Sequence, residues 1–394
     1  MRGVLPSLER YNEYFYYNGH HYFLAGNSES LCLCTFSRYR QVLKLTCNLQ
    51  KYTKDNGKCS FVVNPHLPYV IYANIKKNKQ KTRTYVSFDN GKRFIQIKLR
   101  SKRHIILKKN YGVELDLECS DLFINKHFPE KWVAMFRGKL FRKGLVSRHI
   151  FITFDGGMHW EMLKSRMEKI IVLNRGGLLF ERGKKTHLLY YSFNQGAASY
   201  KIDIYTSYIT SIRPLDFSYT RVVAAINYDK FFNIYTLLLF DFSNMISICD
   251  LMIDRTCTSD DFETVYVPRY HFNCFQGEEI SYLKKKRSAF CFDNRTEVQP
   301  TIKPCPCSLE DFHCKKNYVF EDAFCKLDPD SNFTELNKTC RDGGIPLIRW
   351  NGYDVITHSF AQLDSQLCSP RPIIMDRNSK YADYCISTSN MNVY

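Results

Sequence analysis

One short motif, present twice, constrains the fold of this chain more than any other feature. The two copies share the form Ser/Thr-x-Asp-x-Gly-x-x-aromatic and read Ser87-Phe-Asp89-Asn-Gly91-Lys-Arg-Phe94 and Thr153-Phe-Asp155-Gly-Gly157-Met-His-Trp160. Each copy follows one apolar run and precedes another, which predicts a hairpin turn. In such a turn the Asp carboxylate accepts backbone N–H groups, Gly adopts positive φ, and the final ring packs between strands.

A third, degenerate copy reads Ser192-Phe-Asn194-Gln-Gly196-Ala-Ala-Ser199. Turns of this kind resemble the Asp boxes of β-propellers, where each lies between the third and fourth strands of a blade. Their spacings of 66 and 39 residues fit blades of ~40–50 residues with insertions. The first 245 residues are otherwise a series of short runs rich in β-branched and aromatic residues, which favours strands. We therefore expect a mainly β fold, and we interpret the box aspartates as structural staples rather than as a catalytic acid or nucleophile.

Cysteines dominate the chain after this region. Of 16 in total, nine lie between Cys249 and Cys340, a density typical of disulfide-bonded domains in an oxidising compartment. Glycosylation sequons at Asn294, Asn332 and Asn337 fall in the same region. Neither end carries a signal peptide, and the best candidate span, 235–253, contains two Asp and one Asn. The cysteines and sequons are typical of a secreted protein, whereas the targeting signals are missing. The simplest explanation for this combination is an incomplete chain of a secretory-pathway protein.

The most informative cysteine stretch is Cys305-Pro-Cys307-Ser-Leu-Glu-Asp311-Phe312-His-Cys314, followed by Tyr318, Cys325 and Thr339-Cys340-Arg-Asp-Gly343-Gly344. This pattern, downstream of Asp boxes, resembles the sortilin family of sorting receptors, whose luminal domain joins a ten-bladed propeller to a ten-cysteine module. The chain departs from the family at Lys315-Lys316-Asn317, where Asp and Gly are usual. Only four or five blades fit in the first 245 residues, so the resemblance implies about half of the expected ring.

The resemblance implies four disulfides, which are Cys249–Cys291, Cys274–Cys305, Cys307–Cys340 and Cys314–Cys325. Proximity alone suggests two more pairs, Cys47–Cys59 and Cys368–Cys385, and leaves Cys32, Cys34, Cys119 and Cys257 unassigned. A tetrahedral zinc site at Cys305, Cys307, Cys314 and Cys325 is the alternative. Because the nearby sequons indicate an oxidising compartment, we favour disulfides. The sequence indicates no metal, no cofactor and no catalytic residue.

The charge of the chain is strongly positive, at +17. The run 76–109 holds 13 Lys or Arg and only Asp89 as an acid, so it could contact polyanions. Lysine-rich turns and outward strand positions explain the run as well, and a secretory location removes nucleic acid as a natural partner. The cluster Lys284-Lys-Lys-Arg287 is similar to a nuclear-import signal, but it lies between cysteines expected to be bridged.

These patterns predict three regions: a partial propeller over 1–245, a disulfide-rich module over 246–345 and an irregular tail over 346–394. The resemblance implies a non-enzymatic luminal receptor for peptide or protein cargo in Golgi or endosomal membranes, attached only through a span that this chain lacks. The alternative is a sialidase-type glycoside hydrolase, because those enzymes also use Asp-box propellers. A partial ring further predicts end sheets with open edges.

Overall fold

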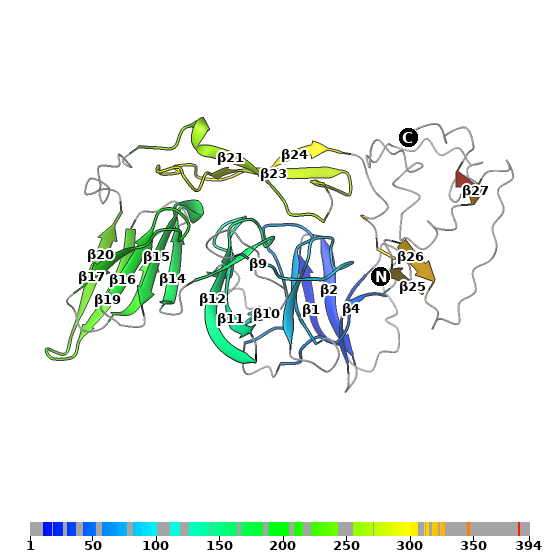
Figure 1. Ribbon diagram of the computed structural model, residues 1–394, viewed down its shortest axis with the longest axis horizontal. Coiled ribbons are helices and arrows are strands. Elements are labelled where there is room, and N and C mark those ends of the chain that lie inside the picture. Colours follow the sequence, from blue (N-terminus) through cyan, green and yellow to red (C-terminus); the bar gives the residue numbers. More distant parts are fainter. Residues whose placement is uncertain are drawn as a thin grey trace.

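The fold is an arc of antiparallel sheets with a smaller, disulfide-bonded sheet lying across it (Figure 1). The structure is a computed structural model. It describes residues 11–17, 19–26, 30–36, 42–52, 57–76, 82–100, 111–118, 126–142, 144–163, 167–183, 188–204, 209–215, 222–242, 255–270, 272–305, 311, 313–314, 317–321, 324–327, 345–346 and 385–386.

Five sheets follow one another along residues 11–241. The first has β1 (Tyr11–Tyr17), β2 (His20–Gly26), β3 (Leu31–Phe36) and β4 (Val42–Thr46), and the second has β5 (Phe61–Val63), β6 (Ile71–Ile75), β7 (Arg83–Ser87) and β8 (Ile95–Gln96). The third has β10 (Tyr111–Leu115), β11 (Ala134–Arg142), β12 (Leu145–Thr153) and β13 (Trp160–Met162), with β9 (Leu99–Arg100) parallel to β13. The fourth has β14 (Met167–Leu173), β15 (Leu178–Gly183), β16 (Leu188–Ser192) and β17 (Tyr200–Asp203), and the fifth has β18 (Ile209–Pro214), β19 (Val222–Asp229) and β20 (Ile234–Asp241).

Consecutive sheets pack face to face, because alternate residues of each strand enter different apolar cores. One core joins the first and second sheets, a second joins the second, third and fourth, and a third joins the fourth and fifth. In β15, for example, Leu179 lies in the second core, whereas Leu178 and Phe180 lie in the third. This meander of stacked four-stranded sheets is the partial propeller predicted from the sequence, and its ring is not closed.

The part of the chain after the arc forms a second small sheet, which we call the cysteine-rich segment (residues 255–327). It contains β21 (Phe262–Tyr266), β22 (Cys274–Phe275), β23 (Glu278–Lys285) and β24 (Thr301–Pro304), followed by the hairpin of β25 (Tyr318–Glu321) and β26 (Phe324–Leu327). In Figure 1 the β21–β24 sheet lies along one side of the arc. Farther on, β27 (Ile345–Pro346) pairs with β28 (Cys385–Ile386).

Helical structure is sparse among the described residues: besides the short turns η2 (Asn174–Gly176) and η4 (Ser259–Asp261), only residues 126–127 and Asp311 are helical. In the described part of the chain, no helix is both long enough and apolar enough to cross a membrane.

Candidate functional site: the Asp-box turns and the cysteine-rich segment

The first Asp box closes the turn from β7 to β8. The Ser87 hydroxyl donates to Asp89 Oδ1 (2.9 Å) and accepts a hydrogen bond from the Gly91 N–H (2.7 Å). Asp89 Oδ1 also accepts from the Arg93 N–H (2.9 Å), and Oδ2 accepts from Arg93 Nε (2.7 Å). Asn90 and Gly91 both have positive φ, and Gly91 lies against Leu45, which leaves no room for a Cβ.

The second box repeats this geometry between β12 and β13. Thr153 donates to Asp155 Oδ1 (2.8 Å) and accepts from the Gly157 N–H (3.0 Å), and the His159 N–H donates to Asp155 (2.9 Å). Burial raises the pKa of the Asp155 carboxyl, but the hydrogen bonds from the side chain and backbone of His159 and from Thr153 outweigh it and leave that pKa below its ordinary value. The Trp160 ring, 0% exposed, packs in the second core.

The third box keeps the turn although its sequence is degenerate. Ser192 donates to Asn194 Oδ1 (3.0 Å), which also accepts from the Ala198 N–H (2.8 Å), and the Gly196 N–H donates to the Ser192 hydroxyl (2.9 Å). The amide oxygen of Asn194 therefore accepts the same two hydrogen bonds that a carboxylate oxygen accepts in the other boxes. The position that holds Arg93 and His159 in the other boxes is Ala198, so the third box has no cation or imidazole of its own beside Asn194.

All three boxes lie between the third and fourth strands of their sheets, as the resemblance to propellers implies. Asp89 is 3% exposed and ion-paired with Arg93, and both box aspartates are occupied by hydrogen bonds within their own turns. This geometry fits the interpretation of Asp89 and Asp155 as staples. Phe94 packs against the first core, as expected for the terminal ring.

The cysteine-rich segment contacts the arc at these same turns. Lys284 Nζ donates to the Phe154 carbonyl of the second box (2.7 Å), and Arg287 Nε donates to the Asn194 carbonyl of the third (3.0 Å). Arg269 donates to the Pro268 carbonyl and, at longer distances, to the carbonyls of Pro68 (3.3 Å) and of Phe88 in the first box (3.5 Å). Three cations of the cysteine-rich segment thus reach backbone carbonyls of three successive box turns.

Two of these contacts come from the Lys284–Arg287 cluster, for which the sequence predicted no contacts. Lys284 and Lys285 are 7% and 4% exposed. Burial lowers the pKa of both amines, that of Lys285 to about 8, and Lys285 Nζ donates to the Ala289 carbonyl (2.6 Å). Burial likewise lowers the pKa of Arg269 to about 10. The one sequence feature that pointed to burial is the position of the cluster between bridged cysteines.

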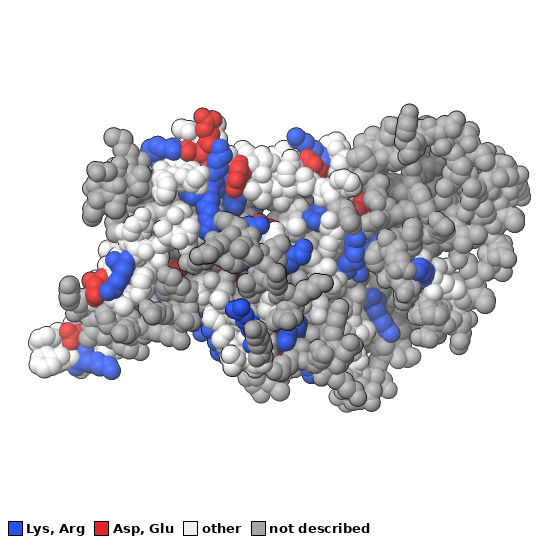
Figure 2. All heavy atoms as spheres, viewed as in Figure 1, with Lys and Arg blue, Asp and Glu red and all other residues white. Residues whose placement is uncertain are grey.

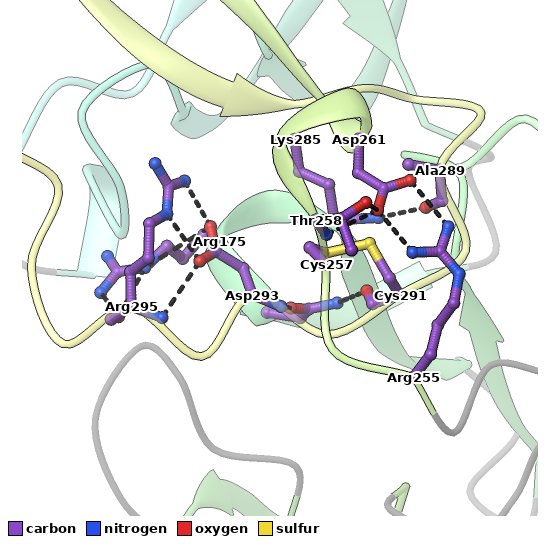
Figure 3. The surroundings of a disulfide bond; sticks show 11 residues. Arg175, Arg255, Cys257, Thr258, Asp261, Lys285, Ala289, Cys291, Asp293 and Arg295 are labelled. Atoms are coloured by element: carbon purple, nitrogen blue, oxygen red, sulfur yellow. Dashed lines mark hydrogen bonds and ion pairs between the residues drawn. A yellow bond between two sulfur atoms is a disulfide. The ribbon is translucent and has the colours of Figure 1, made fainter.

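A second set of contacts runs from the arc into the cysteine-rich segment, at the turn between β14 and β15 (Figure 3). Arg175 donates to Glu130 Oε2 (2.8 Å) and to the carbonyls of Arg295 and Thr296 (2.8 Å for Thr296). Asn174 Nδ2 donates to the Cys291 carbonyl (3.1 Å), and its Oδ1 accepts from the Asp293 N–H (2.9 Å).

Backbone strain supports this second joint. Asn174, Arg175 and Gly176 all have positive φ, which is costly for the two residues that carry side chains. The strain places the Asn174 amide and the Arg175 guanidinium against the loop at 291–296, where both side chains are bonded and nearly fully buried. Because buried polar groups must be paired, these contacts fix the position of the loop.

The disulfides of this region correct part of the expected pairing. Cys291 bonds Cys257, not Cys249. The reason is a backbone bridge: the Cys257 N–H donates to the Phe292 carbonyl (2.9 Å) and the Phe292 N–H donates to the Arg255 carbonyl (3.1 Å), which brings Cys257 beside Cys291. Arg255 and Asp261 form an ion pair beside this disulfide (Figure 3).

The expected pair Cys47–Cys59 is also wrong. Cys47 bonds Cys32, because the register of β3 on β4 places them opposite each other, and Cys59 forms a different disulfide. Cys34 is free and buried.

Two bridges implied by the resemblance are present, Cys274–Cys305 and Cys314–Cys325. Three of the four cysteines of the zinc alternative therefore have no thiolate to offer a metal. Cys257, Asp261 and Cys291 come close enough to surround an ion, but those two sulfurs are bonded to each other. Cys307, Cys340, Cys249 and Cys368 lie outside the described residues, so Cys307–Cys340 and Cys368–Cys385 stay predictions.

The motif aspartate Asp311 accepts a hydrogen bond from the Gln276 N–H (3.0 Å), and its carbonyl accepts from Gln276 Nε2 (3.1 Å). This pairs the motif with the turn between β22 and β23, where Gln276 and Gly277 have positive φ. The motif residues thus have a structural role. Phe312 lies outside the described residues.

The remaining candidates have the following positions. Asn294 is exposed, as a glycan acceptor must be, whereas Asn332 and Asn337 lie outside the described residues. In the basic run, Arg83 lies over the Phe141 ring and Arg93 over the Tyr270 ring, so these two cations make contacts within the chain. On the face seen in Figure 2, Lys and Arg are scattered over the arc.

A cavity of about 500 Å³ lies where the third box meets the cysteine-rich segment. Its lining includes Asn194 and Ala197 from the box and Glu263, Lys286 and Arg287 from the segment. Ala197 is small where the other two boxes carry Lys92 and Met158. Two cations and one carboxylate are the charged groups of its lining.

Comparison with known proteins agrees with the cysteine motif. Residues 228–366 match the family model described as "Sortilin, neurotensin receptor 3, C-terminal". The chain is 24% identical over 268 residues to vacuolar protein sorting/targeting protein 10 of Aspergillus terreus, and 22% identical over 292 residues to that of Talaromyces stipitatus. These alignments cover 64% and 68% of this chain but only 17% and 18% of the relatives. The resemblance to the sortilin family is therefore confirmed at low identity.

Solved structures give weaker matches. A GH74 enzyme of Niastella koreensis has a TM-score of 0.29 at 10% identity and covers 58% of this chain and 36% of its own. The GH74 xyloglucanase of Xanthomonas campestris has a TM-score of 0.28 at 10% identity, with 68% and 42% covered. At these TM-scores neither match carries a conclusion about this chain.

Proposed function

We propose that this chain, a relative of the sortilin-family sorting receptors, is a luminal unit that binds peptide or protein cargo for transport between the Golgi and endosomes, lysosomes or the vacuole. The observation that carries the proposal is the joint between the cysteine-rich segment and the arc. The motif that indicates the family forms disulfides, and the sheet it stabilises donates hydrogen bonds to the box turns. Such a joint supports a rigid, concave binding unit.

The same geometry supports the proposed division of the chain. Residues 1–245 would be the propeller arc, 246–345 the cysteine module and 346–394 a tail. The five sheets end at Asp241, and the first bridged cysteine after them in the described residues is Cys257. The disulfides assigned above support an oxidising compartment for this unit.

A glycoside hydrolase is the less favoured alternative. Its chemistry needs carboxylates or a Tyr/Glu pair free to act on a sugar. Asp89 and Asp155 are held by their own turns, and the relatives are named for protein sorting. We therefore propose a binding protein without catalytic activity.

The test uses the whole chain secreted from a eukaryotic cell, so that its disulfides form. The immobilised protein is exposed to a phage-displayed library of random linear peptides, with reduced and alkylated protein as the matched control. We expect a peptide consensus that binds the oxidised protein and is lost on reduction. No enrichment over the control, or turnover of a fluorogenic sialic-acid conjugate, would overturn the proposal.

A further inference from the structure

The third Asp box differs from the other two at one end of the residue-194 side chain. Oδ1 of Asn194 accepts from the Ser192 hydroxyl and the Ala198 N–H, so two donors fix the oxygen and the other end of the amide is Nδ2. In the other boxes that end is a carboxylate oxygen, which bonds Arg93 or His159. A methyl group replaces those side chains at Ala198, and Nδ2 has no hydrogen-bond partner among the described residues.

The cavity of about 500 Å³ between the third box and the cysteine-rich segment is lined by this asparagine, and we call it the third-box cavity. Its volume is that of a small-ligand pocket, for which ~300–1,000 Å³ is usual. Asn194 leaves this part of the lining neutral, whereas an aspartate, as in the other boxes, would repel an anion. The degenerate box therefore contributes an amide donor to the lining and no negative charge.

Arg287 supplies a second donor, from the cysteine-rich segment. Its Nε donates to the Asn194 carbonyl (3.0 Å) and its Nη1 to Glu161 Oε1 (3.3 Å), so two residues of the arc hold the guanidinium in place. Nη2 has no partner in the described part of the chain, and the side chain is 32% exposed. A guanidinium that is already held loses little conformational entropy on binding, and its N–H groups match the oxygens of a carboxylate.

The charges around the cavity favour one carboxylate over a polyanion. Lys286 Nζ donates to a backbone carbonyl (2.7 Å), so its ammonium keeps two further N–H groups. Glu263 is the acid of the lining, and its Oε1 lies 3.8 Å from Lys284 Nζ. One carboxylate would balance the positive excess around the cavity, whereas a polyanion would also meet Glu263. With their ion-pair partners included, the charged groups are the cations Lys284, Lys286 and Arg287 and the acids Glu161 and Glu263.

We propose that the third-box cavity binds a carboxylate of a bound peptide, with Asn194 Nδ2 and Arg287 Nη2 as donors to its oxygens. This assignment rests on the proposed peptide-binding function and adds the chemical group that one part of the chain recognises. Charge-assisted hydrogen bonds are about twice as strong as neutral ones, so the carboxylate would dominate selection at this cavity. Phe290, which packs with Phe292, gives the lining an apolar surface for the rest of the peptide.

An Asp or Glu side chain and a peptide C-terminus both supply a carboxylate, and the test separates these sources. The intact secreted chain is exposed to two bead-bound libraries of random hexapeptides. The first is N-acetylated and attached through its C-terminus, so that only side chains carry carboxylates. The second is attached through its N-terminus, has a free C-terminus and lacks Asp and Glu. We expect acidic peptides from the first library, peptides from the second, or both, and their affinities are then measured by fluorescence anisotropy.

Asn194→Asp should weaken the binding of these peptides about tenfold or more, because it replaces a donor with a like charge. The turn should be kept, since a carboxylate makes the same bonds in the other boxes. Asn233→Asp is the matched control. It adds the same charge in another turn, where Asn233 Oδ1 accepts from the Tyr228 hydroxyl (2.8 Å), and it should leave binding unchanged.

A second variant tests the cavity without a change of charge. Ala197→Met introduces the side chain that the second box carries at Met158, and it should weaken the same peptides by occupying the cavity. No enrichment from either library would overturn the peptide-binding function and this assignment with it. Enriched peptides without a carboxylate, equal binding to Asn194→Asp and Asn233→Asp, or undiminished binding to Ala197→Met would overturn this assignment alone.

Discussion

Substitution of Asp89 measures how much of an Asp box depends on charge and how much on an acceptor oxygen. Its carboxylate accepts from the Ser87 hydroxyl and the Arg93 N–H at Oδ1, and from the Arg93 guanidinium at Oδ2. The aspartate is 3% exposed. Hydrogen bonds to a charged group contribute ~1.5–3 kcal/mol each, and a buried donor left unpaired costs a similar amount. Because the three bonds share one group and are not additive, we expect Asp89→Ala to lower the free energy of unfolding by about 3–4 kcal/mol.

Asp89→Asn should cost much less, about 1 kcal/mol. The third box is the natural precedent: Asn194 accepts from the Ser192 hydroxyl and the Ala198 N–H with its amide oxygen alone. In the asparagine variant the two bonds to Oδ1 remain, and only the pair with the partly exposed Arg93 side chain is lost.

The assay is guanidinium unfolding followed by tryptophan fluorescence, since Trp132 and Trp160 are 2% and 0% exposed. Asp229→Ala is the control, because Asp229 accepts two backbone N–H bonds in a more exposed hairpin turn, and it should cost no more than about 1 kcal/mol. The reasoning is refuted if Asp89→Asn is as costly as Asp89→Ala, or if Asp89→Ala costs no more than the control.

Three further substitutions test the joint. Arg175→Lys should lower the free energy of unfolding by about 2–3 kcal/mol, because the single amine of a lysine cannot replace the forked guanidinium that reaches Glu130 and the carbonyls of residues 295–296. Arg148 is exposed, so the control Arg148→Lys should change the free energy of unfolding by less than ~0.5 kcal/mol. Cys257→Ser should cost ~3–4 kcal/mol for a loop of this length and leave a free thiol at Cys291 by mass spectrometry; an unchanged Cys291 would contradict the assigned pair. Lys285 has a pKa of about 8 in the fold and an ordinary value of 10.5, so the unfolded chain binds more protons between these pH values and stability should rise from pH 8 to 10. Lys285→Met should flatten that rise in thermal unfolding, and an unaltered slope would exclude Lys285 as its source.

The Asp boxes were predictable because their chemistry is local. Ser, Asp and Gly within five residues meet across one turn whatever the rest of the chain does, and even Asn194 retains the pattern. The strand-rich arc followed from the same kind of evidence, since strands and turns are encoded by neighbouring residues.

Contacts distant in sequence were not predictable. Cys257 reaches Cys291 through a backbone bridge, and Cys32 reaches Cys47 through strand register, and neither can be deduced from cysteine spacing. Lys284 is buried where its amine donates a hydrogen bond to the carbonyl of Phe154, which lies 130 residues earlier in the chain. A run of lysines reads the same in the sequence whether its amines are exposed to water or are buried against the Asp-box turns.

Disulfide mapping of the intact secreted chain tests the central claim most directly, namely that a cross-linked cysteine-rich segment is joined to an Asp-box arc in an oxidising compartment. Mass spectrometry after digestion without reduction should find Cys257–Cys291, Cys274–Cys305 and Cys314–Cys325 as linked peptides. Free thiols at Cys274, Cys305 and Cys314, or a metal released from them, would contradict the account.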